Sequence, residues 1–290
     1  MSTSRTSQKL PGFVPLLLVF VLFVIFLYGP MLTIFILSFQ GPEGGLTFPL
    51  RGMSLHWFHK LAEGLGVVDI AAALKRSLAL GTVVMLFTVV LSLMAGLAFR
   101  KKLKSGDLIF YITVASLIMP SIIVSLGIGL QFRLLDNAIK WGLETFGFTE
   151  GLESFGTSLG LYTSALGAHL TWTLPFGLLI MFAVFNRFNP AYEEAAQDLG
   201  ATPWQTFRHV VLPLIAPSLV GVGMFGFTLS WDEIARTSQA IGDVNTLPLE
   251  LQGLTTTVTN PAIYALGTVT TLISFVVMGL TFFIAKVLKK

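Results

Sequence analysis

Six long apolar stretches constrain the fold of this chain more than any other feature. They cover about residues 13–39, 77–99, 108–130, 158–185, 210–230 and 263–284. An α-helix needs roughly 20 residues to cross a hydrocarbon core about 30 Å thick, and each stretch is long enough. A helix also satisfies its own backbone hydrogen bonds in lipid. The sequence therefore predicts an all-α membrane protein with six transmembrane helices.

The composition favours the membrane class over a soluble domain. Hydrophobic residues make up 54% of the 290 residues and charged residues only 11%, whereas soluble domains carry about 25% charged residues. The absence of cysteine excludes disulfides and cysteine-ligated metal sites. The net charge of +3 is small and does not suggest nucleic-acid binding. With no linker or internal repeat, we expect one transmembrane domain over 1–290.

The first apolar stretch follows Arg5 and Lys9, as the core of a secretory signal would. It is much longer than the roughly 7–15 residues of a signal core, and no small-residue cleavage site follows it. We therefore expect an uncleaved first span.

Lysine and arginine are distributed in a way that predicts both termini in the cytoplasm. The segments placed inside by this topology contain Arg5, Lys9, Arg100, Lys101, Lys102, Lys104, Arg187, Arg208, Lys286, Lys289 and Lys290. Those placed outside contain fewer: Arg51, Lys60, Lys75, Arg76, Arg133, Lys140 and Arg236. Cytoplasmic loops are enriched in these residues, and the cluster RKKLK at 100–104 adjoins a span end. That cluster outweighs Lys75 and Arg76, which run against the rule.

A polar stretch, EEAAQDLGATPWQTFRHVVLP at 193–213, separates the fourth and fifth spans. Asn189 and Pro190 are typical of a helix start, and Gly200 of a helix end in the left-handed conformation. The sequence therefore predicts a short helix at about 190–200, outside the bilayer on the cytoplasmic side. Thr202 and Gln205 then form a capping-box pattern that begins a second helix.

The spacing in this polar stretch resembles the signature of the permease subunits of binding-protein-dependent ABC importers. The pattern E-A-A-x3-G-x9-[I/V]-x-L-P is met by Glu194-Ala195-Ala196, Gly200, Val210 and Leu212-Pro213. In that family the short helix is the coupling helix, which seats on the ATPase subunit. The resemblance implies a type I importer fold. It assigns the coupling role to Glu193, Glu194, Ala195, Ala196, Asp198, Gly200 and Ala201.

Further stretches resemble the spermidine/putrescine branch of the family. They include YGPMLTIFILSF (28–39), SLHWFHKL (54–61), LIMPSIIVSLGIGL (117–130), GAHLTWTLPF (167–176), FNPAYEEAAQDLGAT (188–202) and FTLSWDEIARTSQAIGDVNTLPLELQGL (227–254). Glu233 stands where the branch usually has a second aspartate. The resemblance implies import of a small organic solute, with a polyamine as the leading candidate. An amino-acid derivative or a phosphonate remains the alternative.

Four residues are candidates for the translocation pathway: His169, Trp231, Asp232 and Glu233. Ionisable residues at or within a span are often functional. Asp232 and Glu233 are expected at the outer end of the fifth span, where they would attract a cationic solute. The alternatives are an anchor in the membrane interface or a pair with Arg236. His169 is expected to be neutral and hydrogen-bonded to a neighbouring helix, with packing, substrate contact and gating all open.

Other motifs point to packing rather than chemistry. GVGMFG at 221–226 matches G-x-G-x-x-G but lies in an apolar span without a preceding strand, which favours close helix contact over dinucleotide binding. Pro120 and Pro175 are expected to kink helices around a cavity. No Walker A, H-E-x-x-H or G-x-S-x-G pattern occurs. We therefore expect a non-catalytic chain with no cofactor or metal of its own.

The resemblance also implies partners and a location. It implies a homologous second permease subunit (expected as a heterodimer), two cytoplasmic ATPase subunits that bind ATP and magnesium, and a periplasmic or lipid-anchored solute-binding protein. The chain is expected to span the bacterial inner membrane, in contact with lipid. A stand-alone secondary transporter or channel is the alternative of a different class, and would require inverted repeats. A membrane-embedded enzyme would require catalytic residues converging within the spans.

Overall fold

A computed structural model describes residues 13–64, 69–100, 106–257 and 260–288. The chain divides into two compact units, each considered by itself: 1–65 with 254–272, and 66–253 with 273–290. Seven of the basic residues that support the predicted topology lie outside the described residues: Arg5, Lys9, Lys101, Lys102, Lys104, Lys289 and Lys290.

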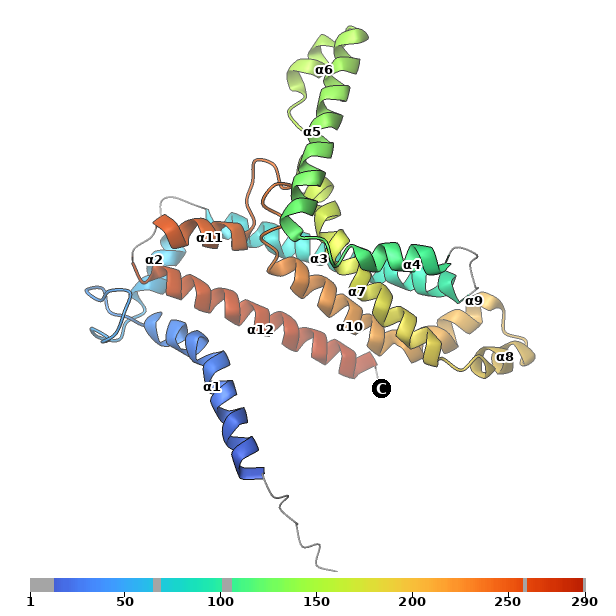
Figure 1. Ribbon diagram of the computed structural model, residues 1–290, viewed down its shortest axis with the longest axis horizontal. Helices are drawn as coiled ribbons and strands as arrows, with labels where there is room; N and C mark the ends of the chain where they lie inside the picture. Colours follow the sequence, from blue (N-terminus) through green and yellow to red (C-terminus); the bar gives the residue numbers. More distant parts are fainter. Residues whose placement is uncertain (1–12, 65–68, 101–105, 258–259, 289–290) are drawn as a thin grey trace, which may run out of the picture. The chain divides into compact units, whose positions relative to one another are not determined.

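The described residues are almost entirely helical (Figure 1). The α-helices are α1 Phe13–Leu37, α2 His56–Glu63, α3 Ile70–Phe99, α4 Gly106–Ala115, α5 Ser121–Thr145, α6 Thr149–Ser154, α7 Leu166–Arg187, α8 Ala191–Asp198, α9 Pro203–Thr206, α10 Leu212–Trp231, α11 Leu247–Thr257 and α12 Ala262–Leu288. Single π-helical segments at Leu161–Ala165 and Phe207–Val211 lead into α7 and α10. Among the described residues, six helical segments are long and apolar enough to cross a membrane, so the predicted all-α class with six spans is confirmed.

The third apolar stretch differs from its expected outline. The helix expected over 108–130 is interrupted, because α4 ends at Ala115 and α5 begins at Ser121. Pro120 immediately precedes α5 and does not lie inside it. A proline lacks the N–H that a continuing helix would need, so the helix restarts after it. The span candidate is α5, which continues to Thr145, well into the link expected at 131–157.

The core of the second unit consists of α3, α7 and α10, which pack side by side (Figure 1). The buried residues of α3 recur every three or four positions and are mostly small: Ala73, Ser77, Leu80, Gly81, Val84, Thr88, Ser92 and Gly96. This spacing places them on one helix face. The Thr88 and Thr173 hydroxyl oxygens lie 2.8 Å apart between α3 and α7. Small residues on one face allow helices in lipid to approach closely.

The glycines of GVGMFG take part in the same packing. A Cβ added at Gly226 would lie 3.1 Å from Thr88 Cβ, and one at Gly223 would lie 3.3 Å from Val89 Cγ2. Both glycines are buried on the side of α10 that faces α3. The helix-packing interpretation of this motif is therefore confirmed for these two positions. Pro175 lies inside α7, as expected.

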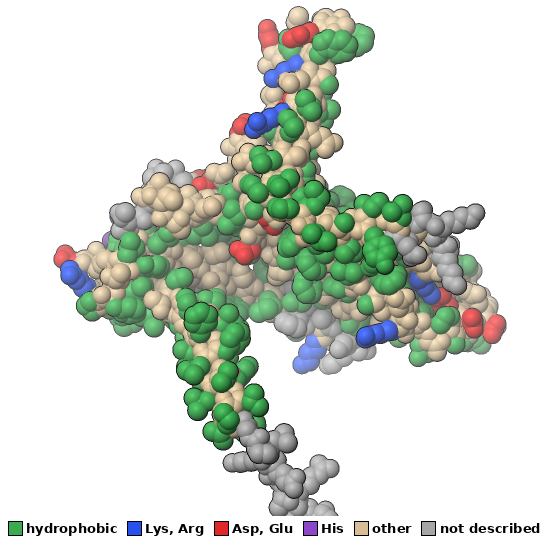
Figure 2. Space-filling view, viewed as in Figure 1, with side chains coloured by type: hydrophobic (Ala, Val, Ile, Leu, Met, Phe, Trp, Pro, Cys, Tyr) green, Lys and Arg blue, Asp and Glu red, His purple; other side chains and the backbone are tan. Residues whose placement is uncertain are grey.

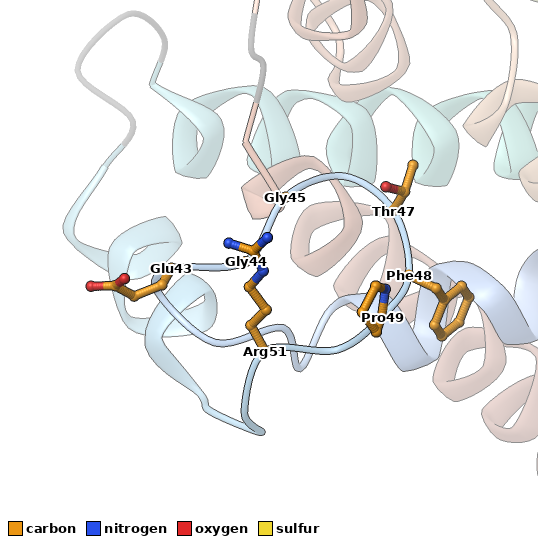
Figure 3. Close-up of a pocket in the computed structure, with 7 residues that line it drawn as sticks. All are labelled: Glu43, Gly44, Gly45, Thr47, Phe48, Pro49 and Arg51. Carbon is orange, nitrogen blue, oxygen red and sulfur yellow. The ribbon is translucent and has the colours of Figure 1, made fainter.

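The first unit contains α1, α2, the start of α12 and a closed loop. Trp57 of α2 is buried against Ala262 and Ala265 of α12, and the Tyr264 hydroxyl donates to the Leu46 carbonyl oxygen at 2.7 Å. The loop between α1 and α2 encloses a hollow of about 310 Å³ lined by Glu43, Gly44, Gly45, Thr47, Phe48, Pro49 and Arg51 (Figure 3).

Exposed apolar side chains cover the outside of several helices. Figure 2 shows hydrophobic side chains over α1 and α4, and acidic side chains at the end of the second unit where α8 lies. Along α1, only Leu37 is buried. A helix that is apolar on all sides is stable in lipid or against other helices, which agrees with a spanning role for α1.

Candidate functional site

The short polar helix between the fourth and fifth spans forms as the sequence predicts. α8 covers Ala191–Asp198, within the expected range 190–200. The Ala191 N–H donates to Asn189 Oδ1 at 3.1 Å, which satisfies one free amide at the helix start. Gly200 adopts φ +87° after the helix end, and its N–H donates to the Gln197 carbonyl oxygen at 2.8 Å. Residues other than glycine rarely adopt this conformation, so Gly200 sets the direction in which the chain leaves α8.

The second short helix begins with the predicted capping box. The Gln205 N–H donates to Thr202 Oγ1 at 3.3 Å, and the Thr202 N–H donates to Gln205 Oε1 at 2.8 Å. Pro203 occupies the first turn, where a missing N–H costs nothing. The α9 helix is therefore fixed at its start by its own side chains.

The connection from α9 to α10 is π-helical. It covers Phe207–Val211, directly before Pro213. Pro213 cannot donate a backbone hydrogen bond, and its ring crowds the carbonyl four residues earlier. Widening the preceding turn relieves this conflict. The chain thus passes from the polar segment into the fifth span without a break.

α8 presents part of its surface outward. Of the candidate coupling residues, Glu194, Ala195, Asp198 and Gly200 are exposed, whereas Glu193, Ala196 and Ala201 are half-buried. Sequence analysis missed two large apolar residues beside them. Leu199 is 90% exposed and Trp204 is 64% exposed. Exposed apolar side chains among acidic ones are typical of a protein-binding surface. The sequence signal for these two residues was that they lie within or next to the predicted motif.

Glu193 makes a contact that the sequence did not indicate. Both of its carboxylate oxygens accept hydrogen bonds from the Arg100 guanidinium at 2.9 Å. Arg100 follows α3, and its guanidinium carbon lies 5.0 Å from the Phe185 ring centre and 5.2 Å from that of Phe188. Glu193 and Glu194 are adjacent in sequence, but about 100° apart around the helix. They therefore face different surroundings.

A second polar cluster lies after α10, in residues 232–242, and contains a buried arginine. Arg236 is fully buried. Its guanidinium donates to Thr171 Oγ1 and to Ser121 Oγ, and its centre lies 4.7 Å from the Trp172 ring. Burial lowers the pKa of Arg236, and the attraction of Glu233 opposes that shift. An arginine stays protonated in proteins, so a positive charge is held between α5 and α7.

His169 joins the same cluster. It is buried in α7, and its Nδ1 lies 2.8 Å from Ser230 Oγ while Nε2 lies 2.8 Å from Thr237 Oγ1. The expected hydrogen bond to a neighbouring helix is therefore present, since Ser230 belongs to α10. The second contact reaches the 232–242 segment. A role in packing, substrate contact or gating stays a prediction.

The other three pathway candidates are placed differently from one another. Trp231 is buried and stacks on Phe227 at 5.8 Å between ring centres. Asp232 is exposed, although nearby protein atoms desolvate its carboxyl and raise its pKa. Glu233 Oε1 accepts the Arg236 backbone N–H at 2.8 Å. Glu233 thus contacts the backbone of Arg236, and among the described residues no ion pair joins the two side chains.

Small residues of α5 also hold the 232–242 segment. Ser125 Oγ donates to the Arg236 carbonyl oxygen at 2.7 Å and accepts the Gln239 N–H at 3.1 Å. Gly129 lies so close that an added Cβ would be 2.5 Å from the Gln239 carbonyl oxygen. Neither residue has a sequence signature, because a lone serine or glycine in an apolar helix is compatible with many neighbours.

The two clusters consist of side chains that contact several helices. Within the described part of the chain, no three histidine, aspartate or glutamate residues are grouped to hold a metal ion. The cluster around α8 offers an exposed acidic and apolar surface. The cluster around residues 232–242 supplies a buried charge and a hydrogen-bonded histidine between helices.

Comparison with known proteins identifies the chain's relatives. Residues 88–290 match the family described as "Binding-protein-dependent transport system inner membrane component". The chain is 31% identical over 252 residues to the putrescine transport system permease protein PotI of Escherichia coli K12, covering 84% of this chain and 80% of the relative. It is 24% identical over 255 residues to the spermidine/putrescine transport system permease protein PotC of the same organism, with 87% of each chain covered.

Solved structures support the same fold. A chain of a bacterial ABC transporter involved in the import of the acidic polysaccharide alginate matches with a TM-score of 0.67 at 18% identity, covering 96% of each chain. A chain of the MetNI methionine ABC transporter matches with a TM-score of 0.54 at 19% identity, covering 76% of this chain and 96% of that one. These similarities establish the type I importer permease fold. Together with the family match, they place the chain among the inner-membrane permease components of binding-protein-dependent ABC importers.

Proposed function

We propose that this permease imports a polyamine of the putrescine or spermidine type. The observation that carries this proposal is the 31% identity to a putrescine permease over 84% of the chain. The exposed carboxyl of Asp232 after α10 would attract a cationic solute at the pathway entrance. Glu233, His169 and Trp231 are proposed to act around the same entrance, through the contacts of the 232–242 segment.

The partners are proposed on the same basis. A homologous second permease would complete the pathway, and two cytoplasmic ATPase subunits would bind ATP and magnesium and hydrolyse the ATP. A solute-binding protein would deliver the polyamine from outside. α8 would dock on an ATPase subunit through its exposed residues, with Leu199 and Trp204 as apolar contacts. This arrangement requires both termini to be cytoplasmic.

The substrate proposal is tested by uptake into proteoliposomes that contain the assembled transporter and its binding protein. We expect ATP-dependent, saturable uptake of radiolabelled putrescine or spermidine. A panel of amino-acid derivatives and phosphonates, at the same concentration, provides the comparison. Uptake of one of those solutes without polyamine uptake would show that the substrate assignment is wrong while leaving the importer class intact.

Replacing Gly200 tests the coupling role of α8. We expect Gly200→Val to lower transport and to weaken the stimulation of ATP hydrolysis by substrate. A β-branched residue at φ +87° costs about 1–2 kcal/mol in the left-handed region. No atom lies within 4 Å of the added Cβ, so the effect would come from the backbone and not from a clash. The measurement is substrate-stimulated ATPase activity of the reconstituted transporter.

Gly200→Asn is the matched control, since asparagine adopts the left-handed region more readily than other residues. It should retain most of the stimulation. Equal stimulation in the valine variant and the unmodified protein would contradict the assigned role of the helix end.

A further inference from the structure

The contact between Arg100 and Glu193 ties the polar segment to the transmembrane core. Two parallel hydrogen bonds of 2.9 Å join the guanidinium to the carboxylate. Their side chains are 24% exposed, so the pair is largely shielded from water. Bidentate arginine–carboxylate contacts fix orientation as well as distance. The pair therefore restrains both the position and the rotation of α8 relative to the end of α3.

Aromatic side chains contact the Arg100 guanidinium, and one of them also contacts α8. Arg100 lies against the rings of Phe185 and Phe188, and Phe188 makes an edge contact with Tyr192 of α8, with ring centres 6.1 Å apart. A guanidinium over an aromatic face is attracted to it. Arg100 thus contacts both the end of α7 and the residues that follow it.

Helices α3 and α7 pack closely one turn before the ion pair. A Cβ added at Gly96, one turn before Arg100, would lie 2.9 Å from ring atoms of Phe185. The approach of α3 to α7 therefore depends on a residue without a side chain. The ion pair lies at the end of a rigid helix contact, rather than on a separate loop.

We propose that Arg100 and Glu193 are positioning residues that make α8 move as one body with α3 and α7. This inference rests on the proposed coupling role of α8. Glu193 is directed into the permease and holds the helix, which leaves Glu194 and Leu199 on the exposed surface for the ATPase subunit. The two adjacent acids of the motif thus have separate tasks. Movement imposed on the exposed surface would reach the core through the ion pair.

A double-mutant cycle in the reconstituted transporter tests the pair. We expect Arg100→Ala and Glu193→Gln each to lower ATP-dependent uptake at least tenfold while the ATPase subunits still co-purify with the permease. Removing one partner leaves the other charge unpaired, so the double variant should be no worse than the worse single variant. Arg100→Lys should be intermediate, because lysine keeps the charge but not the two-point contact.

Arg187→Ala is the matched control, because Arg187 is an exposed arginine at the end of α7. It should change uptake less than twofold. Losses that add in the double variant, or an Arg100→Ala variant as mild as the control, would overturn the proposal. If the unmodified chain fails to couple ATP hydrolysis to uptake, the proposed function fails instead.

Cross-linking supplies an independent measurement. The chain has no cysteine, so a short thiol cross-linker acts on this subunit only at an introduced R100C/E193C pair. Because α8 and α3 are proposed to move together, cross-linking should raise the uptake of this double variant at least threefold over the uncross-linked form. Loss of its remaining uptake on cross-linking would show that the two positions separate during transport, and would overturn the proposal.

Discussion

Replacing Gly177 by leucine is expected to prevent the permease from accumulating in the membrane. Gly177 lies on the buried face of α7, opposite α3. An added Cβ would overlap Ser92 Oγ and lie 3.1 Å from Thr88 Cγ2, before the rest of a leucine is placed. Overpacking a core costs about 1–3 kcal/mol or more. Here it would also separate α3 from α7, whose association in lipid depends on close contact.

The measurement is the amount of membrane-inserted protein and its melting temperature after purification. Gly221→Leu is the matched control, because Gly221 lies on α10 of the same helix core but is only half-buried, and no neighbouring atom lies within 4 Å of its added Cβ. The control should accumulate close to the normal level. Ser92→Gly should partly restore a Gly177→Ala variant, because it removes the overlapping side chain. Equal accumulation of the two leucine variants would refute this account of the helix contact.

Replacing Arg236 by alanine should destabilise the end of the permease formed by residues 232–242 and abolish most transport. The side chain is fully buried and holds hydroxyls of α5 and α7 together through Ser121 and Thr171. We expect the free energy of unfolding to fall by about 3 kcal/mol. An unpaired buried polar group costs about 1–3 kcal/mol, and the lost packing of the arginine side chain adds to this cost. The reconstituted transporter should melt earlier and take up little solute.

Two variants separate this explanation from a general effect of lost charge. Arg133→Ala removes an exposed arginine from α5, and exposed substitutions usually change stability by less than about 0.5 kcal/mol. Arg236→Lys keeps the charge but loses the planar contact with Trp172. Its stability should therefore lie between those of Arg236→Ala and Arg133→Ala. An Arg236→Ala variant as stable as Arg133→Ala would contradict the structural role.

Local sequence patterns predicted the polar segment well, because its structure depends on local contacts. The capping box of Thr202 and the left-handed Gly200 involve residues no more than three positions apart. Apolar length predicted the six spans for a similar reason. It did not predict where helices break, and the stretch at 108–130 contains the interruption before Ser121. An apolar run gives the number of residues available to a helix without setting the exact helix ends.

Contacts between residues far apart in the sequence could not be predicted from it. Arg100 was counted only as a cytoplasmic charge, but it pairs with Glu193, which lies 93 positions later. Asp136 falls between the third and fourth expected spans, but it lies in α5 and accepts a hydrogen bond from Thr157 Oγ1 at 2.6 Å. A charged residue looks the same in the sequence whether or not its side chain has a partner, so only the folded chain shows which residues are paired.

The sequence by itself determined the class of this protein, its number of spans and the position of the short polar helix at Ala191–Asp198. Those properties depend on the length of apolar stretches and on local backbone preferences, and both are set by residues that are close together in the sequence. The tertiary structure decided which acid of the Glu193–Glu194 pair faces the core and which is exposed. It also decided that Arg236 is buried rather than exposed in a loop. Both outcomes depend on helix packing, which brings together residues that no local pattern relates.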